Sequence, residues 1–180
     1  MSIFSFGEHI EGKGFKVLNE RVVRGNSGIM LLLGFVAFVN AFVLKNYSIL
    51  PYISGFLLFN FLIAILINPK FAPTIFVSWL LVRKQSPLYI GAVQKRFAWS
   101  LGSALSGAIF ILSFYLLHDV QYFQPICIMC LICLALMFLE TAFGICVGCK
   151  LYYLTLKMGI LKTPEEKPNC IGDSCKVDQA

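Results

Sequence analysis

Long apolar segments without charge constrain the fold of this chain more than any other feature. Residues 28–44, GIMLLLGFVAFVNAFVL, carry no charged side chain, and a helix extended slightly at both ends reaches the ~20 residues that cross a bilayer. With 180 residues, 58% of them hydrophobic and 13% charged, the chain has more apolar surface than one soluble core can bury. We therefore expect an all-α membrane protein, a four-transmembrane-helix bundle with spans at about 25–45, 52–67, 97–117 and 123–148.

A fifth apolar segment lies between the second and third of these spans. Residues 71–82, FAPTIFVSWLLV, form a helix of only ~18 Å, too short for a hydrocarbon core of ~30 Å. We expect an interfacial or re-entrant helix at about residues 73–84, with Trp79 at the depth that tryptophan rings prefer.

The segments outside the membrane are polar. Residues 1–27 contain scattered charges instead of the pattern of a cleavable signal peptide, and Asn19 is a suitable N-cap for a helix that begins at Glu20. The sequence predicts a cytoplasmic N-terminal segment over residues 1–27, a membrane domain over 28–154 and a flexible cytoplasmic tail over 155–180.

Basic residues alternate between the two sides of the four predicted spans. The N-terminal segment holds four Lys and Arg, residues 68–96 hold five and the chain from Lys150 onward holds five, whereas the turn at 45–52 has one and that at 118–122 has none. By the positive-inside rule both termini face the cytoplasm. The same rule accounts for the net charge of +6, so we expect no nucleic-acid partner.

Cysteines concentrate in residues 121–150, which hold five of the seven. Cys127 and Cys130 form one C-x-x-C and Cys146 and Cys149 form another, a spacing used for reversible disulfides, persulfide chemistry and soft-metal binding. The predicted topology places the first pair at the outer face and the second at the cytoplasmic face.

The single cysteine between the two pairs, Cys133, fits packing better than chemistry, because cysteine behaves as a small hydrophobe in apolar helices. The Cys146/Cys149 pair is flanked and interrupted by Gly144 and Gly148, which permit bending and the close approach of a partner. Lys150 beside Cys149 favours its thiolate.

One acidic residue, Glu140, falls in the middle of the fourth predicted span. A carboxyl at that depth is costly, so we expect it to be protonated, paired with a polar group of another helix or part of a proton path. A structural alternative is a hydrogen bond to Asn40, Asn60 or a serine of the third span.

The two C-x-x-C pairs are too far apart for direct exchange. Cys133 and Cys146 are thirteen residues apart, ~20 Å along a helix, while thiol exchange needs sulfur atoms in contact. A relay across the membrane would need a mobile carrier, such as a quinone, or a partner on each side. Two further cysteines in the tail, Cys170 and Cys175, are candidates for a shuttle to the Cys146/Cys149 pair.

Three segments resemble the bacterial integral-membrane family catalogued as domain of unknown function 4395. They are residues 17–29, VLNERVVRGNSGI, residues 85–102, QSPLYIGAVQKRFAWSLG, and residues 140–152, ETAFGICVGCKLY. The resemblance implies a small multi-helix protein of the bacterial inner membrane, associated with thioredoxin-like and sulfurtransferase proteins. The positions that match its motifs are Glu140, Gly144, Cys146, Gly148 and Cys149, with Gln94, Lys95, Arg96 and Trp99 as a second cluster.

Three hypotheses about function follow. The first is a protein that handles thiol redox equivalents or sulfane sulfur, with Cys146, Cys149, Cys127, Cys130 and Glu140 as candidate catalytic residues and a thioredoxin-like or sulfurtransferase partner. The second is a transporter of soft metal ions or sulfur species that uses thiol pairs at both faces, with any metal at Cys146 and Cys149. The third is a non-catalytic accessory subunit.

Several expectations are common to these hypotheses. Gly144, Gly148, Lys95, Arg96 and Trp99 are assigned packing or structural roles. The lipid bilayer is a partner, and the small residues of the third span would let another helix approach closely, as in an oligomer. The residues point to no resident cofactor, and a quinone or a soft metal stays open.

Overall fold

The computed structural model describes residues 6–8 and 15–159. Four of its helices are long and apolar enough to cross a membrane, which confirms the predicted all-α membrane fold. They are α1 (Glu20–Phe42), α2 (Leu50–Leu62) with a π-helical turn at Ile63–Ile67, α4 (Ala92–Leu116), and α5 (Phe123–Phe138) with a 3-10 turn at Val120–Tyr122 before it and a π-helical turn at Leu139–Phe143 after it.

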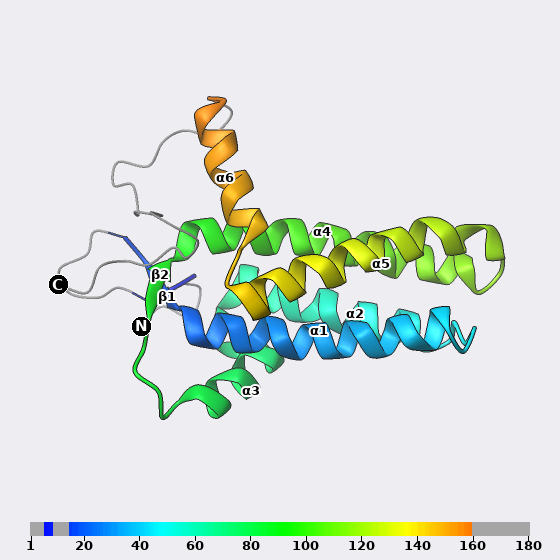
Figure 1. Ribbon diagram of the computed structural model, residues 1–180, viewed down its shortest axis with the longest axis horizontal. Helices are drawn as coiled ribbons and strands as arrows, with labels where there is room; N and C mark the ends of the chain where they lie inside the picture. The colour runs from blue at the N-terminus through cyan, green and yellow to red at the C-terminus, as the bar shows by residue number, and fades with distance from the viewer. Residues whose placement is uncertain (1–5, 9–14, 160–180) are drawn as a thin grey trace.

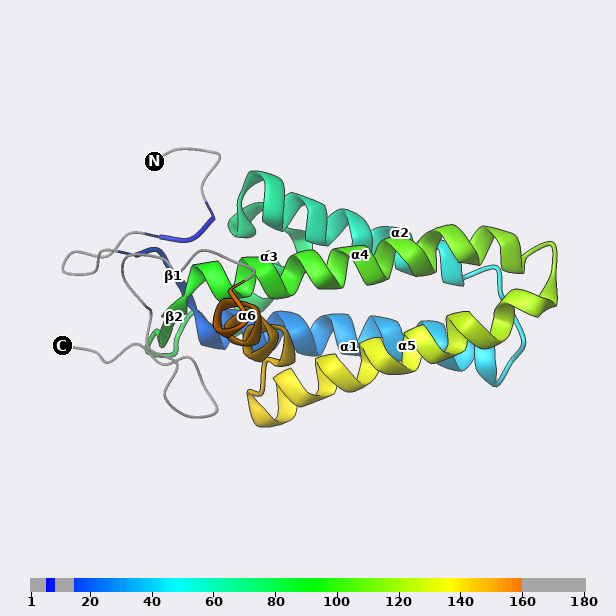
Figure 2. The ribbon, with the colours of Figure 1, turned by 90° about the horizontal axis from the view of Figure 1, so that it is seen from above.

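The four long helices form an elongated bundle in which α2 packs on α4 and α1 packs on α5 (Figures 1 and 2). The connections at residues 43–49 and 117–119 lie at one end of the bundle, here called the turn end. The opposite end carries a small sheet and the short helix α3 and is called the sheet end. Among the described residues, Lys45 is the basic residue at the turn end, and the other Lys and Arg lie at or near the sheet end.

The sheet is an element that the sequence analysis did not predict. Strand β1 (Val17–Asn19) pairs antiparallel with β2 (Tyr89–Gly91), with Leu18 opposite Ile90. Each strand directly precedes a long helix, so the pairing holds the first turns of α1 and α4 together. Strands of three residues give little sequence signal, and their stability here comes from contacts that are distant along the chain.

The predicted N-cap of α1 is confirmed. The side chain of Asn19 accepts a hydrogen bond from the backbone N–H of Arg21 at 3.1 Å and another from the N–H of Leu88 at 3.3 Å. One amide oxygen therefore satisfies a free donor at the helix start and also ties it to the segment before β2.

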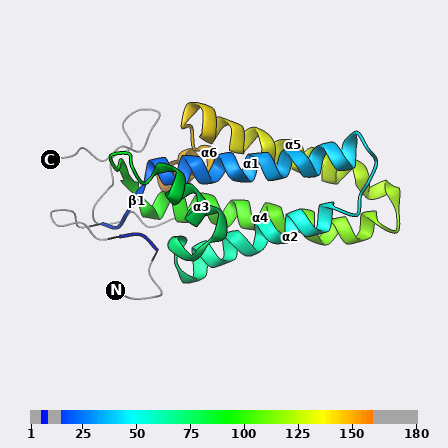
Figure 3. The same ribbon diagram turned by 90° about the horizontal axis from the view of Figure 1, so that it is seen from below.

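The short helix α3 (Pro73–Val82) packs along α1 at the sheet end (Figure 3). The hydroxyl of Ser78 donates to the carbonyl oxygen of Val22 at 2.6 Å, and the backbone N–H of Thr74 donates to Oδ1 of Asn60 at 3.1 Å. Ten residues are too few to span a bilayer alone, as the sequence analysis expected. Polar contacts between buried groups fasten α3 to the bundle.

Two of the predicted span boundaries need correction. The third span was expected to begin at residue 97, but α4 begins at Ala92, so Lys95 and Arg96 belong to the helix. The fourth was expected to continue to residue 148, but the helix ends at Phe143 and Gly144 turns the chain with φ 70° and ψ 13°. A separate helix, α6 (Val147–Lys157), follows and leaves the bundle at a steep angle (Figure 1).

Candidate functional site

The site is built around the break between α5 and α6. The N–H of Gly144 donates to the carbonyl of Glu140 at 3.1 Å, and the N–H of Ile145 donates to that of Leu139 at 3.1 Å, which satisfies carbonyl groups at the helix end. The left-handed backbone conformation at this position favours glycine, and a Cβ here would overlap the guanidinium of Arg24. Glycine is favoured here by the backbone conformation, and any larger residue would also displace the end of the Arg24 side chain.

After this turn, Cys146 caps the N-terminus of α6. Its Sγ accepts a hydrogen bond from the backbone N–H of Cys149 at 3.3 Å, and its carbonyl accepts from the N–H of Lys150 at 3.1 Å. Both cysteines are buried, with 9% and 2% of their surface exposed. The partial positive charge of a helix N-terminus stabilises an anionic sulfur, so this position favours a thiolate at Cys146.

The two thiols of the pair have opposite acidities. The hydrogen bond from the Cys149 side chain and the nearby positive charge of Lys95 lower the pKa of Cys146 below its ordinary value, against the effects of burial and of Glu140. The same thiol–thiol hydrogen bond, together with burial, raises the pKa of Cys149 well above its ordinary value. Cys146 is therefore the more acidic thiol of the pair and Cys149 the one that keeps its proton, so the thiolate expected at Cys149 is favoured at Cys146 instead.

Lys95 and Glu140 form a buried ion pair beside the cysteines, between the first turns of α4 and the end of the fourth span. The exposed fraction is 6% for the Lys95 side chain and 16% for that of Glu140. Each charge offsets the cost of burying the other. The expected position of Glu140 in the middle of the span was wrong, because it lies three residues before the end at Phe143. Its ion-pair partner is Lys95, not Asn40, Asn60 or a serine.

Sequence reasoning missed the electrostatic role of Lys95. It was assigned to packing because the third span was expected to start after it, which placed its charge in a loop. The available signal was its place in the cluster from Gln94 to Trp99, the second group of positions matching the family motif. The amino-acid sequence alone does not show that Lys95, on the first turn of α4, faces Glu140.

Other residues of that cluster and of the motif contact one another at the junction of α4 and α6. Gln94 is fully buried, and its Nε2 donates to the hydroxyl of Tyr153 at 2.7 Å. Gly148 lies against Ala98, where an added Cβ would approach the Ala98 Cβ to 2.5 Å. Trp99 is buried, and the Arg96 guanidinium lies over the Phe6 ring at 5.8 Å. The two helices therefore meet at contact distance beside the cysteines.

The other three described cysteines are not part of this site. Cys127 and Cys130 lie on α5 toward the turn end and Cys133 lies midway along the span; all three are free thiols, and Cys130 and Cys133 pack against a hydrophobic cluster between the helices. Cys170 and Cys175 lie outside the described residues. Within residues 6–8 and 15–159, no cluster of three or more His, Cys, Asp or Glu side chains is arranged to hold a metal ion.

Residues 18–157 match the family described as Domain of unknown function (DUF4395). The comparisons with curated proteins and with solved structures gave no match.

Proposed function

Because the chain belongs to the DUF4395 family, whose description gives no activity, we propose a function from the site itself: thiol redox or sulfane-sulfur chemistry at the Cys146/Cys149 pair. One observation carries the proposal. The Sγ of Cys146 sits at the N-terminus of α6, accepts the Cys149 N–H and lies near the buried Lys95 ammonium. These are the surroundings that convert a cysteine into a nucleophile.

In this proposal Cys146 attacks and Cys149 resolves. The Cys146 thiolate attacks a disulfide of the partner, forming a mixed disulfide and releasing one partner thiolate. Cys149 then loses its proton and attacks Sγ of Cys146, which forms the Cys146–Cys149 disulfide and releases the second partner thiol. With a sulfane-sulfur donor, the same thiolate takes the terminal sulfur as a persulfide and the donor leaves as a thiolate.

The partner we propose is a soluble thioredoxin-like or sulfurtransferase protein on the cytoplasmic side. The distribution of basic residues supports this side, because the sheet end carries all described Lys and Arg except Lys45. The protein would then lie in the bacterial inner membrane with both termini in the cytoplasm and with the Cys146/Cys149 pair facing that compartment.

The test is the pH dependence of alkylation in the purified, reduced protein. A lowered pKa keeps Cys146 as the thiolate below pH ~8.5, the value of a free cysteine, and its iodoacetamide rate should fall only as the pH drops through the lowered pKa. Cys149 should react slowly over the same range. Peptide mass spectrometry resolves the two rates, and in denaturant both should titrate near ~8.5.

A second measurement tests the redox step. Diamide should join Cys146 to Cys149 in the wild type and in a Cys133→Ser variant, and Cys146→Ser should form no disulfide with Cys149. The proposal fails if the two thiols titrate together at the ordinary value, or if diamide leaves both of them reduced.

A further inference from the structure

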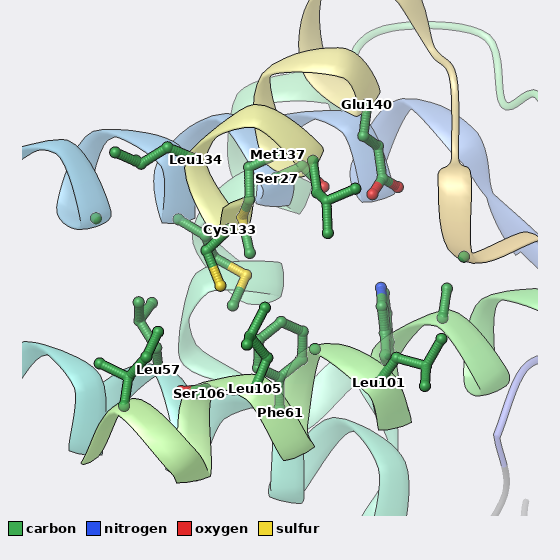
Figure 4. A pocket seen from close by; sticks show the side chains of 18 of the residues that line it. Ser27, Leu57, Phe61, Leu101, Leu105, Ser106, Cys133, Leu134, Met137 and Glu140 are labelled. Carbon is green, nitrogen blue, oxygen red and sulfur yellow. The ribbon is translucent and has the colours of Figure 1, made fainter. Parts of the chain in front are cut away.

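A partly open cavity of about 220 Å³ lies between α1, α2, α4 and α5 and extends to the start of α6 (Figure 4). Its walls are mainly apolar, with Leu57, Phe61, Leu105, Leu134 and Met137 around it. Most of the cavity lies between the four membrane-spanning helices, so an apolar ligand that fills it can enter from the lipid phase.

Cysteines from different segments of the chain line this one cavity. Cys130 and Cys133 line it in the bundle, while Glu140 and Cys146 line it next to α6. Figure 4 shows Cys133 and Glu140 at different positions along the same space. The nucleophile of the proposed thiol pair therefore borders an intramembrane binding space.

The size of this space sets the size of the ligand. An apolar protein cavity of ~150 Å³ accommodates benzene, so a cavity of about 220 Å³ accommodates a substituted six-membered ring. The aromatic side chains of Phe61 and Trp99 are among its lining residues and offer faces against which a planar ring can pack.

Disulfide formation at the pair adds a chemical requirement. When the Cys146 thiolate and the Cys149 thiol form a disulfide, one S–H bond is broken and one S–S bond is made, so two electrons and one proton leave the sulfurs. An acceptor in contact with Cys146 must take up the two electrons, this proton and a second proton from water, which replaces the one that Cys146 released when it ionised. Among apolar, membrane-soluble molecules with a single substituted ring, a benzoquinone meets this requirement, because its two carbonyl oxygens become the two hydroxyls of a quinol.

We propose that this cavity binds the ring of a membrane quinone, which oxidises the Cys146/Cys149 dithiol to the disulfide and leaves as the quinol. The inference rests on the proposed redox function, with the thiol–disulfide exchange running in the direction in which a dithiol of the partner reduces the Cys146–Cys149 disulfide, and it adds the electron acceptor that oxidises the pair again. It also gives the thiol pair a link to the membrane that does not need exchange with the distant Cys127/Cys130 pair.

The experiment uses the full chain, reduced and reconstituted in lipid nanodiscs, with an ubiquinone analogue that carries a ten-carbon tail. One equivalent of quinol should form per Cys146–Cys149 disulfide, measured by chromatography and by peptide mass spectrometry. Diamide serves as a second oxidant that is not expected to need the cavity.

Two substitutions on α5 form a matched pair. Leu134→Trp fills the cavity, whereas Leu131→Trp adds the same side chain one turn away at an exposed position that does not line it. We expect Leu134→Trp to slow oxidation by the quinone at least tenfold and to leave oxidation by diamide unchanged. Leu131→Trp should change neither rate. Leu105→Phe fills the cavity from α4 with a smaller change and should also slow the quinone reaction.

The outcomes separate the two proposals. If diamide forms the disulfide and the quinone does not, the quinone site is refuted and the thiol function stands. Equal quinone rates in Leu134→Trp and Leu131→Trp would show that the reaction takes place outside the cavity, which also refutes the site. If neither oxidant forms the disulfide, the thiol function fails and the quinone proposal fails with it.

Discussion

At the scale of single residues, the site depends on charges held close to one sulfur. Lys95 lowers the pKa of Cys146 and Glu140 raises it, and the two side chains are bound to each other. The acidity of the nucleophile therefore depends on an ion pair whose members come from two different helices, and the two members act in opposite directions.

Lys95→Met and Glu140→Gln should shift the pKa of Cys146 in opposite directions. Lys95→Met removes the positive charge, so the pKa of Cys146 rises and its alkylation rate at neutral pH falls, by about threefold or more. Glu140→Gln removes the negative charge, so the pKa falls further and the rate at neutral pH does not drop. The measurement is the iodoacetamide rate at Cys146 by mass spectrometry.

Comparing the two variants separates an electrostatic effect on Cys146 from a structural one. Both substitutions break the same buried ion pair, and each leaves one group without its partner, at a cost of roughly 3–5 kcal/mol. A purely structural effect would change the Cys146 rate in the same direction in both proteins. Equal changes would contradict an electrostatic role of Lys95.

At the scale of the elements, the turn at Gly144 decides where α6 begins. Had the helix run on to residue 148, as the sequence analysis expected, Cys146 would lie inside it and its Sγ would not accept the Cys149 N–H as an N-cap. The φ of 70° ends the fourth span and lets α6 start in a new direction. The thiolate-stabilising position of Cys146 is therefore a consequence of this one turn.

Gly144→Ala should disrupt the site more than a matched substitution at Gly159. Both glycines have a positive φ, so alanine costs roughly 1–2 kcal/mol of backbone strain at either position. A Cβ at Gly144 would also displace the end of the Arg24 side chain, whereas at Gly159 no atom of the described residues lies within 4 Å. We expect Gly144→Ala to lower the melting temperature further than Gly159→Ala and to slow Cys146 alkylation. Equal effects of the two variants would argue against a special role for this turn.

At the scale of the whole molecule, the charges and the elements separate between the two ends of the bundle. The sheet, α3 and most described basic residues gather at the sheet end, and the turn end is joined by two short connections with Lys45 as its described basic residue. Such an asymmetry across four spans predicts that the sheet end faces the cytoplasm and the turn end faces the opposite side of the membrane.

Single cysteines in a cysteine-free background would report this orientation. We expect Asp119→Cys, at the turn end, to react with an impermeant maleimide added to intact spheroplasts, because the predicted orientation places that end outside the cytoplasm. Lys157→Cys, near the end of α6, should react only in inside-out vesicles. Both positions are exposed, so accessibility within the protein is matched. The reverse pattern would invert the topology and place the Cys146/Cys149 pair in the periplasm.

The sequence alone determined the class of the fold, because four long, mainly apolar segments need a bilayer to bury their apolar surface. It also singled out Cys146, Cys149 and Glu140 as candidates, since a C-x-x-C flanked and interrupted by glycines and an acid in an apolar segment are local patterns. Their arrangement was decided by the tertiary structure. The pairing of Glu140 with Lys95 joins residues far apart in the chain.

The same division holds for the sheet, the cavity and the start of α6. Strands β1 and β2 stabilise one another only once α1 and α4 stand side by side, and the cavity exists only between helices that are already packed. The turn at Gly144 depends on a left-handed conformation that any glycine can adopt, so the glycine alone does not show that the helix ends there. The apolar segments and the spacing of the cysteines can be read from the sequence. Charge pairs, cavities and helix ends depend on contacts between distant segments.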